Sequence, residues 1–481
     1  MRSWDAELVA AGAGARLLRA PAVGDPPGPA GAGIDSRATR TGELFVGLQG
    51  SRSDGGTHAP AALRAGAWGV LVAPPHAAAA LADTEAGAVL EHPDPLAGLQ
   101  ALALAWREQL GRGGTRVVAI TGSAGKTSTK DILAAVLAPM ARTAASPANH
   151  NTEIGLPLAI LGAGEEVEVL VLELAMRGPG QIAELTGIAR PEVGVIVNVG
   201  AAHLELLGSL EAIAAAKAEL IAGMASGSTA VVPFGEPLLE PHLRGDLRTI
   251  SFGGDGADVT LSERHPDGTV VIRDHDRSVR LRPSFSQAHN LQNLLAAVAA
   301  ARSLGYTPEG ELRVEFSAMR GQRHPLPGGG LLIEDCYNAN PMSMRAALED
   351  LAASAPGRRV AVLGDMLELG EQAPALHREV GRRAGEAGVD LLVAVGSLAP
   401  EMAAGFPGEV RTVPDANAAA GLVPRLLAAG DTVLVKGSRG VGLEVVCGAL
   451  RGAADVPDGG HGAGHTPGPG LQAQATAPGP R

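Results

Sequence analysis

The stretch Val117-Val-Ala-Ile-Thr-Gly-Ser-Ala-Gly-Lys-Thr-Ser-Thr-Lys-Asp131 decides the fold of this chain. Its apolar first part predicts a buried strand, its glycines predict a turn, and the residues that follow predict a helix. Glycines let backbone N–H groups face an anion, and the start of a helix adds its positive end. We therefore expect a phosphate-binding loop that uses Gly122, Ser123, Gly125, Lys126, Thr127 and Ser128.

Two side chains of this loop have separate expected roles. The Lys126 ammonium would meet the terminal phosphates of a nucleotide, and the Thr127 hydroxyl would reach Mg²⁺. Ile120 stands where the standard P-loop pattern has its first glycine, so the loop is a shortened variant. The apolar strand before the glycines favours a true phosphate site over an ordinary glycine turn with an exposed lysine.

Lysine is rare in this chain, which has four lysines among 39 basic residues. Arginine evidently serves wherever a plain positive charge is enough. The remaining lysines are therefore candidates for positions where arginine fails, because an ammonium can lose its proton and be modified whereas a guanidinium stays charged. Besides Lys126 and its neighbour Lys130, these are Lys217 and Lys436.

Short apolar runs on both sides of the phosphate loop indicate a parallel sheet. Residues 117–121, 167–174 and 193–199 are runs of the kind that is buried on both faces of such a sheet. Polar sequence over 255–282 predicts a β-rich excursion. A second alternation of strands and helices follows, with strands expected at 331–334, 359–364, 391–396 and 432–436.

These patterns predict an α/β protein, because strands and helices alternate along most of the chain. Its 481 residues are too many for one core. We expect a small N-terminal α/β domain over 1–98, a central P-loop-type ATPase domain with a mostly parallel sheet over 99–310, a C-terminal Rossmann-like α/β domain over 311–452, and a disordered tail over 453–481.

Composition and charge exclude several classes of protein. A net charge of −12 argues against a general nucleic-acid binder, which usually has a basic face. Two cysteines are too few for a disulfide framework. The N-terminus is acidic where a signal peptide would be basic. No apolar run reaches the roughly 18 residues that span a bilayer, so we expect a cytoplasmic protein without membrane insertion.

Three polar residues follow or lie beyond the central strands and are candidate metal ligands. Glu173 ends one apolar run, His203 follows the next, and Lys217 lies on an expected helix fourteen residues later. Ligands of open α/β sheets bind beyond the carboxyl ends of the strands, and carboxylates there can hold Mg²⁺. Each residue alone has an ordinary explanation as a helix cap or a surface group. Because all three follow a phosphate loop along the chain, together they indicate a site for a nucleotide and its metal ion.

At this point the sequence resembles a known family. The phosphate loop, the segment Ser146–Pro157 and Asn198-Val-Gly-Ala-Ala-His203 look like the Mur ligases, the ATP-dependent amide-forming enzymes of peptidoglycan precursor synthesis. Tyr337-Asn-Ala-Asn-Pro341 and Val362–Glu371 resemble the branch that adds a dipeptide. The resemblance covers nearly everything up to about residue 450, and it includes Asp35-Ser-Arg and Gly42-Glu-Leu-Phe-Val near the N-terminus.

The resemblance implies an activity and its substrates. It implies ATP-dependent joining of D-alanyl-D-alanine to UDP-N-acetylmuramoyl-tripeptide through an acyl phosphate, by a monomeric enzyme. Two Mg²⁺ ions are implied as cofactors of ATP. Thr127 and Glu173 match ligands of the first ion, His203 matches a ligand of the second, and Lys217 matches a carbamylated lysine that serves the second ion.

Further positions match the family's binding segments. Asn290 and Asn293 match the adenine-contacting segment, and Arg323 and Asp335 match positions that face the nucleotide. The match also assigns the UDP-sugar site to Ser36 and Arg37, and it assigns substrate-binding roles to Asn149, Asn151, Asn338, Asn340 and Ser343. Whether the last three residues face the dipeptide or ATP stays open.

Some residues depart from the family's pattern, and three other functions stay in view. Glu334 replaces a usual Asp, Cys336 stands for a usual Ser, and Thr152 replaces a common Asn, but none of the expected metal ligands is changed. A sister ligase would add a single amino acid, a non-catalytic homologue would only bind nucleotide, and a phosphate-loop kinase would need neither the UDP-sugar segment nor Lys217.

Overall fold

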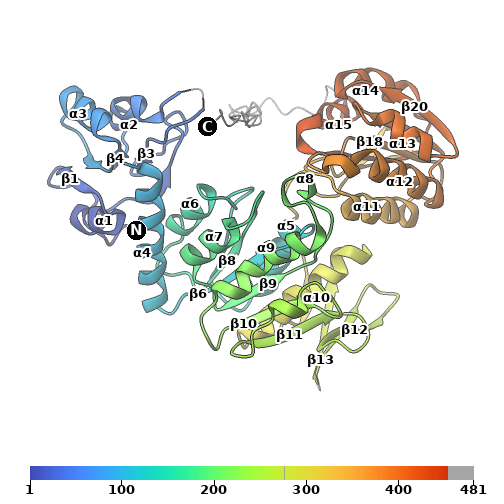
Figure 1. Cartoon of the computed structure of the whole chain (residues 1–481), viewed down its shortest axis with the longest axis horizontal. Helices are drawn as coiled ribbons and strands as arrows, with labels where there is room; N and C mark the ends of the chain where they lie inside the picture. The colour runs from blue at the N-terminus through green and yellow to red at the C-terminus, as the bar shows by residue number, and fades with distance from the viewer. Residues whose placement is uncertain (52, 276, 453–481) are drawn as a thin grey trace, which may run out of the picture. The chain divides into compact units, whose positions relative to one another are not determined.

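The computed structural model describes residues 1–51, 53–275 and 277–452 (Figure 1). The chain forms two compact units, of which the first is Met1–Leu102 and the second begins at Ala103. The predicted tail over 453–481 lies outside the described residues. Among the helices that the structure describes, none has both the length and the apolar character that a membrane span requires.

The first unit contains a five-stranded sheet in the order β1-β5-β4-β3-β2 within its described residues. The β1 strand pairs antiparallel with β5, and the other neighbours are parallel. Phe45, Val70 and Val89 fill its core together with alanines of the helices. The elements are α1 (Ala6–Ala13), β1 (Arg16–Arg19), β2 (Ala32–Gly33), β3 (Leu44–Val46), α2 (Ala59–Arg64), β4 (Gly69–Val72), α3 (Pro74–Asp83), β5 (Ala88–Glu91) and the first part of α4 (Pro95–Arg112), whose later residues belong to the second unit.

The second unit begins with a ten-stranded sheet in the order β15-β14-β13-β12-β11-β10-β9-β6-β8-β7, counted over the described residues. All neighbours from β7 to β12 are parallel, and β13 runs antiparallel to β12 and to β14. Its strands are β6 (Arg116–Thr121), β7 (Thr143–Ala145), β8 (Val169–Glu173), β9 (Val193–Ile196), β10 (Thr229–Pro233), β11 (Arg248–Gly253), β12 (Val259–Arg264), β13 (Val270–Asp274), β14 (Arg277–Pro283) and β15 (Gly310–Leu312).

Helices cover both faces of the central strands, as the apolar runs predict. Val118 and Ile120 of β6 belong to the core that α5 and α10 share, and these two helices pack side by side. The α7 and α9 helices form a second packed pair (Figure 1). The helices are α5 (Lys126–Leu137), α6 (Gly155–Leu161), α7 (Gln181–Ala189), α8 (Leu204–Leu207), α9 (Leu210–Gly223) and α10 (Ala288–Ser303).

A six-stranded sheet follows in the order β16-β17-β21-β18-β19-β20, again over the described residues. Only β16 runs antiparallel, to β17. The elements are β16 (Gln322–Leu326), β17 (Gly330–Glu334), α11 (Pro341–Ser354), β18 (Arg359–Gly364), α12 (Ala373–Glu386), β19 (Leu391–Val395), α13 (Ala399–Gly405), β20 (Glu409–Val413), α14 (Ala416–Leu422), β21 (Thr432–Lys436) and α15 (Glu444–Arg451).

The predicted strands match the observed ones within a few residues, and the α/β fold class is confirmed. The excursion predicted over 255–282 forms β12, β13 and β14 and extends the central sheet. The strand predicted over 193–199 ends at Ile196, because the following residues turn toward the phosphate loop, where Asn198 bonds the loop backbone. The domain boundaries at 98, 310 and 452 stay predictions.

Candidate active site

The phosphate loop lies between the end of β6 and the start of α5, as its sequence predicts. Gly125 has a φ of 77°, which side-chain-bearing residues rarely adopt. A Cβ at this position would also lie 2.7 Å from Asn293 Oδ1. Glycine is therefore required at Gly125 both by the turn and by the close approach of α10.

The side chain of Asn198, two residues after β9, is hydrogen-bonded to the loop backbone. The Asn198 Oδ1 atom accepts hydrogen bonds from the backbone N–H groups of Ser123 at 3.0 Å and Ala124 at 2.9 Å. Its Nδ2 donates to Ala124 O at 3.0 Å. The Ser123 hydroxyl donates to Gly200 O at 2.8 Å. Asn198 was not predicted to have this role, although it begins the segment Asn198–His203 that carries part of the resemblance.

Lys126 is the first residue of α5 and folds back over the loop. Its Nζ donates to Gly122 O at 2.9 Å. Burial lowers the pKa of this ammonium, the charge of Glu173 raises it, and the charge of Arg320 lowers it again. A partly desolvated ammonium at the start of a helix is well suited to bind a phosphate. The phosphate oxygens would replace the water molecules that burial removes from the ammonium.

Glu173, at the end of β8, is buried at 2% exposure and is held by neutral donors. The Thr127 hydroxyl donates to its Oε2 at 2.8 Å, and Asn151 Nδ2 donates to its Oε1 at 2.9 Å. The Glu173 backbone N–H donates to Ser146 Oγ at 2.9 Å. The structure thus brings together Thr127, Glu173 and Asn151, which were predicted separately, in one network of oxygen ligands.

Lys217 lies on α9 at 1% exposure. Within the part of the chain that the structure describes, no carboxylate pairs with it. Burial, and secondly the positive charge of Lys126, lower its pKa well below the usual value. A lowered pKa increases the fraction of neutral amine near neutral pH, and the neutral amine is the form that reacts with CO₂.

His203 lies between β9 and α8 and contacts Glu368, a residue that was not predicted to belong to the site. The Nδ1 atom of His203 lies against Glu368 Oε2, and the hydrogen bond lowers the pKa of Glu368. The Glu205 backbone N–H donates to Glu368 O at 3.1 Å. His203 and Glu368 have φ values of 60° and 63°, which are uncommon without glycine. Such strain persists only where the surrounding contacts fix it.

Arg320 is a second residue that was missed. Its Nη2 donates to Thr127 Oγ1 at 3.2 Å, and its guanidinium lies 4.2 Å from the centre of the Tyr337 ring. Arg323, which was predicted to face the nucleotide, lines the cavity and bonds Asp350 at 2.7 Å and Ser354 at 2.8 Å, so its role stays a prediction. The sequence could not separate these two arginines, because they are three residues apart in one segment.

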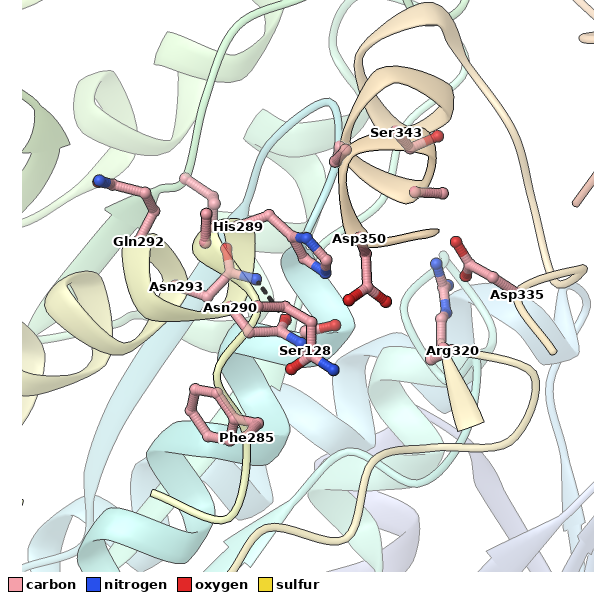
Figure 2. A pocket seen from close by; sticks show the side chains of 18 of the residues that line it. Ser128, Phe285, His289, Asn290, Gln292, Asn293, Arg320, Asp335, Ser343 and Asp350 are labelled. Atoms are coloured by element: carbon pink, nitrogen blue, oxygen red, sulfur yellow. Dashed lines mark hydrogen bonds between the residues drawn. The ribbon is translucent and has the colours of Figure 1, made fainter. Parts of the chain in front are cut away.

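A cavity of about 1040 Å³ is lined by the phosphate loop, by α10, by the segment after β17 and by α11. Figure 2 shows its two sides, with His289, Asn290 and Asn293 projecting from α10 opposite Asp335 and residues of α11. Asn293 Nδ2 donates to Asn290 Oδ1 at 3.3 Å, and both side chains are buried. The predicted residues that line the cavity are Ser123, Gly125, Lys126, Thr127, Ser128, Asn290, Asn293, Arg323, Asp335, Asn338, Asn340 and Ser343.

Asp335 follows β17 and pairs with Lys436, the last residue of β21. Lys436 Nζ lies 2.7 Å from Asp335 Oδ2 and donates also to Asn338 O at 3.0 Å. The Lys436 side chain is only 2% exposed and that of Asp335 is 21% exposed. The pair therefore presents a fixed carboxylate at the cavity wall.

Asn340 and Ser343 begin α11 in a reciprocal cap. Asn340 Oδ1 accepts from the Ser343 N–H at 2.9 Å, and Ser343 Oγ accepts from the Asn340 N–H at 3.0 Å. Asn340 Nδ2 donates to Ser123 O at 3.0 Å. The cap leaves both residues at the cavity, so a structural role adds to the predicted one. Asn338 Oδ1 accepts from the Ala339 N–H at 2.8 Å.

The predicted residues that do not line this cavity are Gly122, Asn151, Glu173, His203 and Lys217, described above, and Ser36, Arg37 and Asn149. In the first unit, Arg37 is exposed and forms a two-point ion pair with Asp35 at 2.8 and 2.9 Å, beside Ser36. Asn149 is exposed, and its carbonyl accepts from the Asn151 N–H at 2.8 Å. The UDP-sugar role of the first two positions and the substrate role of Asn149 stay predictions.

The sequence and the structure are similar to known proteins. Residues 120–301 match the Mur ligase middle domain, and residues 319–439 match the Mur ligase, glutamate ligase domain. The UDP-N-acetylmuramoyl-tripeptide–D-alanyl-D-alanine ligase of Synechocystis sp. is 38% identical over 425 residues, which are 86% of this chain and 90% of the relative.

Two solved structures show the same likeness in three dimensions. The crystal structure of MurF from Acinetobacter baumannii is 28% identical, with a TM-score of 0.81 over 93% of this chain and 98% of that one. MurF ligase from Thermotoga maritima in complex with ADP is 31% identical, with a TM-score of 0.73 over 87% of this chain and 96% of that one.

Proposed function

Because this chain belongs to the Mur ligase family, we propose that it joins D-alanyl-D-alanine to UDP-N-acetylmuramoyl-tripeptide in a reaction driven by ATP. The products are the UDP-linked pentapeptide, ADP and phosphate. The names of the similar ligases support UDP-N-acetylmuramoyl-tripeptide and D-alanyl-D-alanine as the substrates. The similar structure in complex with ADP supports the use of ATP. Cytoplasmic location and the monomeric state stay predictions.

The observation that carries the proposal is the convergence of separate segments on one cavity. The phosphate loop supplies Lys126, α10 supplies Asn290 and Asn293, and the segment after β17 supplies Asp335. A ligase of this kind must bring a triphosphate, a carboxylate and an amine together. A cavity of about 1040 Å³ has the size that this requires.

The reaction needs an activated carboxylate, because the leaving group of a free carboxylate would be oxide. Transfer of the terminal phosphoryl group of ATP gives an acyl phosphate, which the dipeptide amine attacks as phosphate leaves. Phosphoryl transfer is catalysed mainly by positioning and by placed cations. We propose that Lys126 binds the terminal phosphates. Arg320, whose Nη2 lies 3.2 Å from Thr127 Oγ1, would stabilise the negative charge of the same phosphates.

The residues around Thr127 fit a magnesium ion. The Thr127 hydroxyl and the buried Glu173 carboxylate are hard oxygen donors 2.8 Å apart, and Mg²⁺ prefers such ligands. Asn151 fixes the second oxygen of Glu173. Bound Mg²⁺ supplies positive charge to the triphosphate and polarises its terminal phosphoryl group. Thr127 and Glu173 orient that charge, and Asn151 keeps the carboxylate in place.

A second ion fits only if Lys217 is modified. The ammonium of Lys217 cannot ligate a cation, whereas a carbamate on the same nitrogen offers two oxygens. Its burial without a carboxylate partner among the described residues and its lowered pKa favour the neutral amine that forms a carbamate. With Nδ1 facing Glu368, the Nε2 atom of His203 remains to bind the ion. We propose carbamylated Lys217 and His203 as ligands of this second Mg²⁺.

The test is an assay of phosphate release by the purified chain. We expect release from ATP only when both the UDP-tripeptide and D-alanyl-D-alanine are present, with a product whose mass equals that of the pentapeptide. Varied tripeptides in the same assay identify the accepted third residue. Release with a single amino acid instead of the dipeptide would indicate a sister ligase. ATP binding without release under any combination would indicate a non-catalytic homologue.

A further inference from the structure

The two cysteines of the chain meet in the six-stranded sheet, away from the nucleotide cavity. Cys336 follows β17 and Cys447 lies on α15, and both are buried free thiols. Together with Glu334 they offer three ligand atoms that all lie within 4.8 Å of one another. In the part of the chain that the structure describes, this is the one group of three such residues with that spacing.

The alternation of β17 separates this group from the nucleotide cavity. Successive side chains of a strand point to opposite faces. Ile333 and Asp335 line the cavity, whereas Glu334 and Cys336 do not. Cys336 and Cys447 belong to the core on the other face of the sheet. A ligand of the thiols would therefore touch the same strand as the nucleotide but from the opposite side.

The neighbours of Glu334 add two further groups. Arg451 Nη1 donates to Glu334 Oε2 at 2.9 Å. The His324 Nε2 atom lies 3.0 Å from the same oxygen, yet it is buried and has no hydrogen-bond partner among the described residues. Among the described residues, this ring nitrogen therefore has an unused hydrogen-bonding position directly beside the Glu334 carboxylate.

We propose that Glu334, Cys336 and Cys447 bind a thiophilic divalent cation such as Zn²⁺ in a structural site. Zinc takes sulfur, nitrogen and oxygen ligands in a tetrahedron, with ligand atoms about 3.3–3.8 Å apart, and the three ligand atoms here all lie within 4.8 Å of one another. The fourth position is open to water or to His324. The thiol protons leave as the ion binds.

The charges of the group balance around such an ion. Two thiolates and the Glu334 carboxylate carry three negative charges, and the cation carries two positive ones. Arg451, 2.9 Å from Glu334, supplies the remaining positive charge.

The experiment titrates Co²⁺ into the reduced, metal-free full chain in the presence of excess Mg²⁺. Excess Mg²⁺ occupies oxygen-ligand sites, and the two cysteines are the only thiolates that the chain can offer. We expect a thiolate-to-cobalt absorption band that saturates at one ion per chain and is bleached by one equivalent of Zn²⁺. Zinc should also raise the melting temperature by a few degrees.

Variants separate this site from the ligase site. Cys336→Ser and Cys447→Ala should both fold and keep ligase activity. Both variants should lose the cobalt band and the rise in melting temperature with zinc. Glu173→Gln is the matched control and should keep the band while its ligase activity falls. The proposal is wrong if two titratable thiols per chain give no band, or if the band survives in Cys336→Ser.

Discussion

Two buried lysines in the second unit have opposite surroundings. Lys217 on α9 and Lys436 at the end of β21 are 1% and 2% exposed. Lys436 is held by Asp335 at 2.7 Å and by the carbonyl of Asn338 at 3.0 Å. Lys217 has no carboxylate partner among the residues described, and burial and the positive charge of Lys126 both lower its pKa.

The carboxylates of the two regions show the same contrast. Glu173, near the phosphate loop, is held by the neutral side chains of Thr127 and Asn151 rather than by a lysine. Asp335 is held by a cation. A buried ion pair neutralises itself, whereas separated buried charges stay available to a ligand. The region around Glu173 and Lys217 is therefore suited to bind charged ligands. The ion pair of Lys436 and Asp335 instead fixes one wall of the cavity.

The largest expected effect comes from Lys217→Arg, which should lower ligase turnover by about 10³-fold or more. A guanidinium stays protonated and cannot form the carbamate. Phosphate release measures the loss, and a melting curve tests that the fold is kept. In the unmodified chain, depletion of CO₂ should lower turnover and bicarbonate should restore it. Near-normal turnover of Lys217→Arg would falsify the carbamate role.

The two lysines should respond oppositely to removal of their charge. Lys217→Met should leave the free energy of unfolding unchanged or raise it, because an unpaired buried amine is lost. Lys436→Met should lower the free energy of unfolding by about 1 kcal/mol, because the Asp335 carboxylate that remains can be hydrated. Asp335→Asn should lower it by about 3 kcal/mol, because the Lys436 ammonium that remains is buried without a counter-charge. Denaturant unfolding measures all three, and equal losses would contradict the contrast.

The sequence predicted those parts of the site that depend on neighbouring residues. The phosphate loop, its strand and its helix follow from one run of fifteen residues, and all of Gly122–Ser128 lies where that run predicts. The parallel strands were predictable because runs buried on both faces are apolar throughout. Their order in the sheet, with β6 between β8 and β9, depends on long-range pairing that no single run encodes.

The missed residues act across long separations in the chain. Arg320 reaches Thr127 from 193 positions away, and Glu368 reaches His203 from 165 positions away. Arg320 has no local pattern that distinguishes it from other arginines, and Glu368 lies in the segment Val362–Glu371, which resembles the family without giving this residue a role. Asn340 was predicted only as a substrate-binding residue, whereas the structure shows that it also caps α11 and bonds Ser123.

Glu173→Gln tests whether the central carboxylate acts by charge. The amide can still accept a hydrogen bond from Asn151 and donate one to Thr127, so the packing should be kept while the charge is removed. We expect turnover to fall by about 10²-fold, and the concentration of Mg²⁺ for half-maximal rate to rise. The Mg²⁺ dependence of phosphate release measures both. An unchanged Mg²⁺ requirement would show that Glu173 serves the fold alone.

The smallest expected effect lies where the two regions meet, at Glu368 and His203. Glu368→Gln should weaken the orientation of the imidazole and lower activity about tenfold at limiting Mg²⁺, since carboxylates that orient metal-binding histidines usually contribute to this extent. Excess Mg²⁺ should restore most of the rate, which loss of folding would not allow. Glu371→Gln, at an exposed glutamate three residues later, is the matched control and should match the unmodified chain. Equal behaviour of the two variants would mean that His203 does not depend on the carboxylate, and that the two regions contact each other there without coupling.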